Sequence, residues 1–165
     1  MALIRAFSVA PAALRRAATF SPTAVVLARN QDLLDAVAAM NWGAYSAMCD
    51  PSLSCFEHES RSHFVTGLDF HKIYYDAAGV HPGSHRLKRA TMASPHVRFV
   101  GKSCAVLSYV RLVQTVELAT GAATTARAEE TRIWERQGPA QVGARSLEGE
   151  KARWMHVHFH RSQWD

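Results

Sequence analysis

The sequence predicts one α+β domain in which helices come first and a run of antiparallel strands follows. Apolar residues recur at helical spacing over residues 30–40 and 67–76, whereas they alternate with polar residues in most segments after residue 87. The chain has 165 residues, of which 48% are hydrophobic and 20% charged, so it is long enough to bury one core. We therefore expect the helices to pack against one face of a curved sheet.

The helical part is expected to begin where the composition changes near residue 30. Asn30 can cap a helix whose apolar face carries Leu33, Leu34 and Val37. Two glycines and a proline mark a loop after the second helix. The elements expected before the sheet are a helix over 30–40, a turn over 44–49, a strand over 54–58, a helix over 67–76 and a loop over 77–84.

Most of the sheet is expected in the second half of the chain, where alternation is strong. Thr120-Gly121 supplies a turn between two long strands, and the polar segment 137–152 predicts a loop longer than a usual hairpin connection. The expected strands cover residues 87–92, 97–100, 105–117, 124–136 and 153–161.

Residues 1–29 differ in composition from the rest and predict a flexible arm before a domain over 30–165. The arm contains four arginines and no acidic residue, which is typical of an organelle transit peptide. We expect the arm to target the protein to mitochondria, with plastids as the second choice. The alternative is a disordered tail on a cytoplasmic protein.

Charge, hydropathy and cysteine usage exclude several classes of protein. The arm holds most of the net charge of +5, so the near-neutral remainder argues against nucleic-acid binding. No apolar run approaches the ~20 residues that cross a bilayer, so no membrane contact is expected. Cys49, Cys55 and Cys104 are odd in number and form no C-x-x-C pair, which favours free thiols.

Three of the predicted strands each carry an arginine on the face that also carries their large apolar side chains. These arginines are Arg111, Arg132 and Arg161. A buried guanidinium is costly unless it meets a carboxylate or another anion. The arginines therefore predict either internal ion pairs or a pocket for an acidic group.

The residues alone leave these two interpretations open. Glu129, Glu130 and Asp69 are available as internal partners of the arginines. Alternatively, His71 and Tyr74, which share a face of the second helix, can add hydrogen bonds to an arginine-lined cavity that takes a carboxylate.

The last strand carries a second pattern, made of alternating histidines. A regular strand places His156, His158 and His160 on the face opposite Val157 and Phe159. The H-x-H spacing resembles zinc sites, but no further ligand is placed beside it, so we predict no metal site. No phosphate-binding glycine motif, G-x-S-x-G or H-E-x-x-H is present, and we assign no catalytic residue and no cofactor.

Five blocks in order resemble the association (hub) domain of calcium/calmodulin-dependent protein kinase II over residues 30–163. The blocks are Met48-Cys49-Asp50-Pro51, Gly67-Leu68-Asp69-Phe70-His71, Tyr109-Val110-Arg111, Glu129-Glu130-Thr131-Arg132-Ile133-Trp134 and Val157-His158-Phe159-His160-Arg161-Ser162. The resemblance implies a cone-like fold similar to nuclear transport factor 2, with a long N-terminal helix packed against a strongly curved antiparallel sheet.

The resemblance also implies a function. In this family the domain has no kinase activity and assembles into dimers and then stacked rings. Its arginine-lined pocket takes small carboxylates or acidic peptide groups, and Arg111, Arg132, Arg161, His71 and Tyr74 match the pocket positions. We therefore expect a self-associating scaffold, with a kinase-bearing hub subunit as a further partner.

The alternative is an enzyme on the same fold, such as a metal-independent carbonic anhydrase. That type ends in a His-His-His-Ser-Ser motif, whereas this chain has His158-Phe159-His160-Arg161-Ser162 at the matching place. The difference favours the scaffold. Two departures from the hub pattern, at 77–84 and 137–152, bear on pocket selectivity and ring packing.

Overall fold

The computed structural model describes residues 21–61, 63–80, 85–117, 119–138 and 153–163, and its longest helix, α1, spans Pro22–Ala38. Ser21 caps α1, because its side-chain oxygen accepts a hydrogen bond from the Ala24 amide at 3.2 Å, and a proline fits the first turn. The prediction that Asn30 starts this helix is wrong. The predicted boundary at residue 30 falls inside α1, where Asn30 is fully buried.

The other described elements follow in chain order. They are α2 (Trp42–Ser46), β1 (Cys49–Phe56), the 3-10 turn η1 (His58–Ser60), β2 (Val65–Thr66), α3 (Asp69–Val80), β3 (His85–Val100), β4 (Cys104–Glu117), β5 (Ala123–Gln137) and β6 (Arg153–Gln163). Strand β1 starts earlier than predicted, and α3 extends into the predicted loop 77–84. The rest of that loop, 81–84, and most of the predicted loop 137–152 lie outside the described residues, as does the arm up to residue 20.

The strands form one six-stranded sheet in the order β2-β1-β6-β5-β4-β3. Its neighbouring strands are antiparallel, except that β1 and β6 run parallel. The expected α+β architecture is confirmed, whereas the expectation of a purely antiparallel sheet is wrong at this pair. A parallel pair needs a long connection, and here the connection contains most of the domain.

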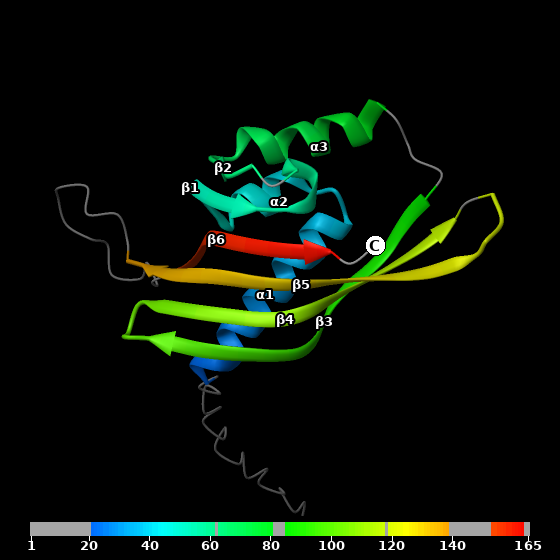
Figure 1. Cartoon of the computed structure of the whole chain (residues 1–165). Helices are drawn as coiled ribbons and strands as arrows, with labels where there is room; N and C mark the ends of the chain where they lie inside the picture. Colours follow the sequence, from blue (N-terminus) through cyan, green and yellow to red (C-terminus); the bar gives the residue numbers. More distant parts are fainter. Residues whose placement is uncertain (1–20, 62, 81–84, 118, 139–152, 164–165) are drawn as a thin grey trace, which may run out of the picture.

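Strand β3 replaces the two separate strands predicted around Ser94-Pro95. Its register against β4 shifts between Ala93 and His96, and Ser94 has a positive φ of 49°. A bulge of this kind accommodates a proline, which cannot donate to the ladder, without ending the strand. The bulge also bends β3, and the long strands β3 to β5 curve together (Figure 1).

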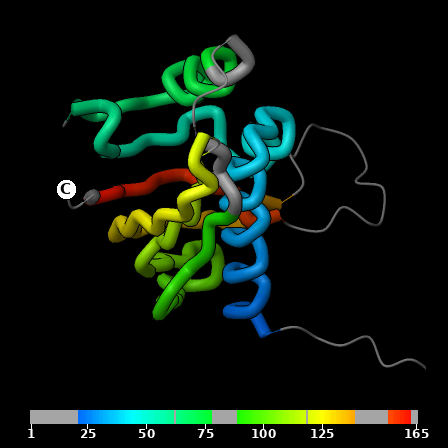
Figure 2. The backbone as a smooth tube through the Cα atoms, turned by 90° about the vertical axis from the view of Figure 1, so that its right-hand side faces the viewer, coloured from blue at the N-terminus to red at the C-terminus, as the bar shows by residue number. Residues whose placement is uncertain are grey.

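Helix α1 packs across one face of the sheet, behind β4 to β6 in Figure 1, and α2 and α3 lie beyond it near β1. The core between α1 and the sheet includes the fully buried Leu33, Leu34, Leu53, Leu107 and Trp134. The other face of the sheet carries no described helix (Figure 2). Among the described helices, none combines the length and apolar character that a membrane span requires.

Candidate functional site

Two of the three predicted arginines converge on one buried carboxylate. Arg111 Nη1 lies 3.1 Å from Glu130 Oε1, and Arg132 Nη2 lies 2.9 Å from Glu130 Oε2. The three side chains come from β4 and β5, whose inward faces alternate as the sequence predicted. Glu130, which is 2% exposed, therefore balances two guanidinium groups inside the core.

Arg132 is the most completely satisfied of the three arginines. Its Nε donates to Tyr109 Oη at 2.9 Å, and its Nη1 lies 3.2 Å from His156 Nε2. Its guanidinium carbon lies 4.7 Å from the ring centre of Phe159, a cation–π distance. These contacts fix Arg132 in one position, so it acts as the centre of a buried polar network rather than as a free cation.

Burial and nearby charges together determine the protonation of this network. Burial alone would raise the pKa of Glu130, but Arg132 and Arg111, together with the Tyr109 hydroxyl, hold it at about 2. Burial and Arg132 lower the pKa of His156 well below its usual range, so this imidazole is neutral. A neutral His156 can accept at Nε2 from Arg132 while Nδ1 contacts Cys49 Sγ at 3.7 Å.

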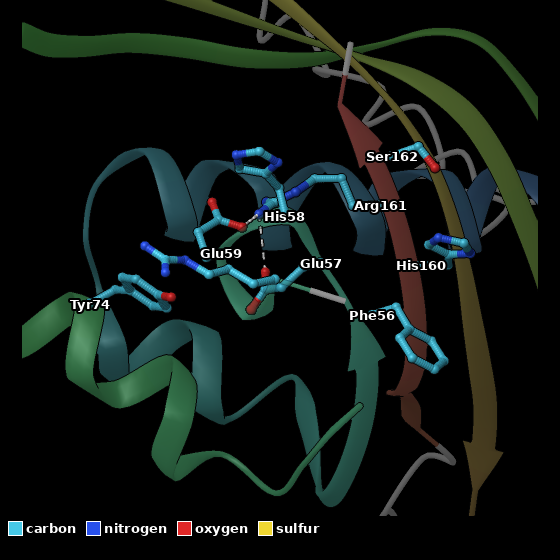
Figure 3. A pocket seen from close by; sticks show the side chains of 9 residues that line it. Phe56, Glu57, His58, Glu59, Tyr74, His160, Arg161 and Ser162 are labelled. Atoms are coloured by element: carbon cyan, nitrogen blue, oxygen red, sulfur yellow. Dashed lines mark hydrogen bonds and ion pairs between the residues drawn. The ribbon is translucent and has the colours of Figure 1, made fainter. Parts of the chain in front are cut away.

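The third arginine lies apart, at an open pocket of about 1000 Å³. Arg161 reaches from β6 towards Glu57 and Glu59 (Figure 3). Its Nη2 lies 3.1 Å from Glu57 Oε2 and also contacts Glu59 Oε2. The pocket lies between the end of β1, η1, α3 and β6, and its wall consists of Phe56, Glu57, His58, Glu59, Arg61, Tyr74, His160, Arg161 and Ser162.

The five predicted pocket residues therefore fall into two zones. Arg161 and Tyr74 line the open pocket, where Tyr74 is 39% exposed. Arg111 and Arg132 belong to the buried network around Glu130, and His71 is buried at 5% exposure behind the pocket wall. The prediction of one cavity lined by all five was based on strand phase for the arginines, on a shared helix face for His71 and Tyr74, and on the family resemblance. None of these separates the two depths.

The structure pairs each of the three arginines with glutamate. The sequence offered Glu129, Glu130 and Asp69 as partners, but of these only Glu130 contacts the arginines among the described residues. Glu129 and Asp69 are exposed. Glu57 and Glu59 were missed; the signal available was the position of Glu57 two residues after the buried Cys55, in phase with it.

The histidines of β6 do not share one face, so that expectation is wrong. The pairing of β5 with β6 shifts between Ile133 and Trp134, and this bulge turns His156 inward with Phe159. His156 is fully buried, His158 Nδ1 lies 2.8 Å from Ser54 Oγ, and His160 is exposed. The three rings therefore cannot meet at one ion.

The family model of the calcium/calmodulin dependent protein kinase II association domain matches residues 24–164. The chain belongs to this family. The calcium/calmodulin-dependent protein kinase type II subunit delta of Oryctolagus cuniculus is 33% identical to this association domain over 132 residues, which are 80% of the chain and 22% of that protein. The type II alpha chain of Drosophila melanogaster gives the same 33% and the same coverage. The chain thus spans about a fifth of the length of these relatives.

Solved structures resemble this association domain over most of its length. The CaMKII hub homology domain of Chlamydomonas reinhardtii is 49% identical at a TM-score of 0.70 and covers 88% of this chain and 100% of that one. The CaMKII hub of S. rosetta is 35% identical at 0.68, covering 88% and 98%. An NTF2-like protein from Rhodospirillum rubrum, 21% identical at 0.60 and covering 84% and 98%, shares the fold, which confirms the NTF2-like expectation.

Proposed function

We propose that this association domain is a self-associating hub that assembles into dimers and closed rings. The observation that supports this proposal best is the sheet face opposite α1, which no described helix covers (Figure 2). Aliphatic side chains on the open face of a sheet are stabilised by burial, and a second subunit can cover the face that the chain itself leaves open.

The composition of this outer face fits an interface between copies. Val106, Val110 and Leu112 project from β4 and are half-buried, and Ile133, which is also half-buried, lies beside Val106 on β5. Enrichment of aliphatic side chains at the centre of a surface is typical of subunit interfaces. The exposed Arg127 and Glu129, opposite Leu112 and Val110 on the same face, add charged groups that can pair with a second copy. Isologous pairing of such faces, combined with ring-forming contacts, produces stacked rings.

Size-exclusion chromatography with light scattering tests the assembly. The protein should elute as a closed multimer at micromolar concentration, and Val106→Lys should shift it to smaller species without loss of far-UV circular dichroism. Ser103→Lys, in the exposed turn before β4, is the matched control and should keep the full size. A monomeric original protein, or a Val106→Lys variant of full size, would contradict the proposal.

The pocket at Arg161 is the proposed site for a small carboxylate or an acidic peptide group. Arg161 is already paired with Glu57 and Glu59, so a ligand has to replace one of these acids. Glu59 is the group to be displaced, because its side chain is 40% exposed whereas that of Glu57 is 6% exposed. The exchange conserves one guanidinium–carboxylate pair, which makes it feasible for a dicarboxylate that also contacts Tyr74.

A kinase-bearing subunit is the proposed further partner. The relatives named as kinases match this chain only over its association domain, so a shared hub surface is the part through which mixed assembly would occur. Co-expression of the two chains followed by purification through a tag on the kinase subunit tests this. Recovery of the present chain with the original sequence, but not with Val106→Lys, is the expected result.

A further inference from the structure

Glu57 of the pocket wall and two residues buried behind it, a cysteine and a histidine, bring three metal-ligating atoms together. Cys55 Sγ, one carboxylate oxygen of Glu57 and one ring nitrogen of His71 all lie within 4.8 Å of one another, and all three residues are buried. We propose that these three side chains bind a divalent transition metal of the zinc class. The site is independent of the proposed assembly and uses different atoms from the Arg161–carboxylate exchange.

Two of the three distances between the ligand atoms match those around a tetrahedral zinc ion. Zn–S, Zn–N and Zn–O bonds of about 2.3, 2.05 and 2.1 Å at tetrahedral angles separate S from N by about 3.5 Å and N from O by about 3.4 Å. In the structure, Cys55 Sγ lies 3.6 Å from His71 Nε2, and His71 Nε2 lies 3.5 Å from Glu57 Oε1. The third separation, from Cys55 Sγ to the Glu57 oxygen, is within 4.8 Å, and it would have to be about 3.6 Å around a bound ion.

An unpartnered oxygen points into the same space. Glu57 Oε1 is buried and has no hydrogen-bond partner among the described residues, and the Glu57 side chain is only 6% exposed. Arg161 contacts the other oxygen, Oε2, at 3.1 Å, which holds the carboxylate in place and leaves Oε1 for the ion. A buried carboxylate oxygen without a partner costs free energy, and a metal bond would remove that cost.

The protonation states also suit a metal. Burial, with repulsion from Arg132 and Arg161, lowers the pKa of His71 to about 4, so its imidazole is neutral and able to ligate. Burial and Glu57 raise the pKa of the Cys55 thiol to about 12, so the thiol must release one proton to solvent when the metal binds. The thiolate and the carboxylate then balance the 2+ charge of the ion.

The ligand set determines the kind of metal that the site prefers and the number of coordination positions that the protein fills. One thiolate, one imidazole and one carboxylate suit Zn²⁺ or Co²⁺ rather than Ca²⁺ or Mg²⁺, which prefer oxygen ligands. Three protein ligands leave a fourth position for water, as in catalytic rather than structural zinc sites. His71 Nδ1 lacks a hydrogen-bond partner among the described residues, so we expect weaker binding than at a fully supported site.

A second buried cysteine provides a matched comparison. Cys49 Sγ lies 3.7 Å from His156 Nδ1, but the nearby charge is Arg132, whose Nη1 lies 3.2 Å from the same ring, and no carboxylate completes a cluster there among the described residues. The two pairs have the same Cys–His chemistry and similar burial. They differ in the carboxylate, so we expect only Cys55 to bind the ion.

The test is a Co²⁺ titration of the untagged full chain under reducing conditions, with absorption spectra recorded at each step. One Co²⁺ per chain should produce the visible bands of tetrahedral Co²⁺ together with a near-ultraviolet thiolate-to-metal charge-transfer band. Zn²⁺ should displace the Co²⁺, and one proton should be released per ion. Cys49→Ser should retain the charge-transfer band, and Cys55→Ser should lose it.

The affinity for Zn²⁺, measured by competition with a chromophoric chelator, should fall at least about 100-fold in Cys55→Ser. Mutation of a residue that only hydrogen-bonds to a metal ligand already lowers metal affinity by about 10–100-fold, and Cys55 is a direct ligand. The elution volume of the variant checks that it is folded, and proton release by the original protein tests the site without any variant. Binding without a charge-transfer band, a band that persists in Cys55→Ser, or no proton release would each overturn the proposal.

Discussion

Replacing Glu130 with glutamine tests whether the buried network is an ion-pair cluster. The change keeps the size of the side chain but removes the one negative charge that faces Arg111 and Arg132. Glu130 is 2% exposed, so two guanidinium groups would be left in the core without a balancing charge. Breaking a buried pair in this way costs about 3–5 kcal/mol of unfolding free energy.

The pKa of Glu130 gives a second estimate of the same energy. Its value of about 2 in the folded state, against the ordinary 4.5, corresponds to about 3 kcal/mol. Because the folded pKa is depressed, this stability is fully present above pH 4.5 and is lost as the pH falls towards 2.

Urea unfolding at neutral pH, followed by the tryptophan fluorescence to which the buried Trp134 contributes, measures the loss. Protomer concentration must be equal in all samples, because the stability of an oligomer depends on it. Asp32→Asn, on the exposed side of α1, is the control and should change the unfolding free energy by less than about 0.5 kcal/mol. A loss below about 1 kcal/mol in Glu130→Gln would refute the reasoning.

Three further predictions concern the pocket, the buried histidine and the N-terminal arm. Malonate at constant ionic strength should raise the melting temperature of the original protein by mass action. Arg161→Gln should lessen that rise, because the guanidinium that can form two charged hydrogen bonds to a carboxylate becomes a neutral amide. An equal rise in both proteins would exclude Arg161 as the anion site. The depressed pKa of His156 means that the unfolded chain takes up a proton first, so this histidine alone should contribute a loss of about 1.4 kcal/mol of unfolding free energy for each pH unit below 6.5. His156→Gln should reduce this slope in urea titrations between about pH 6.5 and 5, and an unchanged slope would contradict the assignment. Residues 1–30 fused to a fluorescent reporter should direct it to an organelle, and mitochondria are expected rather than plastids. Diffuse cytosolic fluorescence would show that the arm is only a tail.

Local patterns in the sequence determined the class of fold and the direction of the arginine side chains. Helical spacing and alternation identified α3, the second half of α1 and the strands β4, β5 and β6, because both patterns arise from the geometry of the backbone itself. The first half of α1 had been assigned to the arm, and β3 had been divided in two. The same alternation placed Arg111 and Arg132 inside, since each shares a strand face with large apolar residues. Five sequence blocks were enough to indicate the family, which the family model then established.

Only the tertiary structure decided which acids meet which arginines and which way His156 faces. Glu57 lies 104 residues before Arg161, and their contact exists because β1 pairs in parallel with β6. His156 turns inward because one bulge between β5 and β6 shifts the alternation at that point. Alternation fixes the face of a side chain but not its neighbour, and a one-residue irregularity reverses even the face. The contacts that make up the site are therefore set by strand pairing, which no local pattern in this chain encodes.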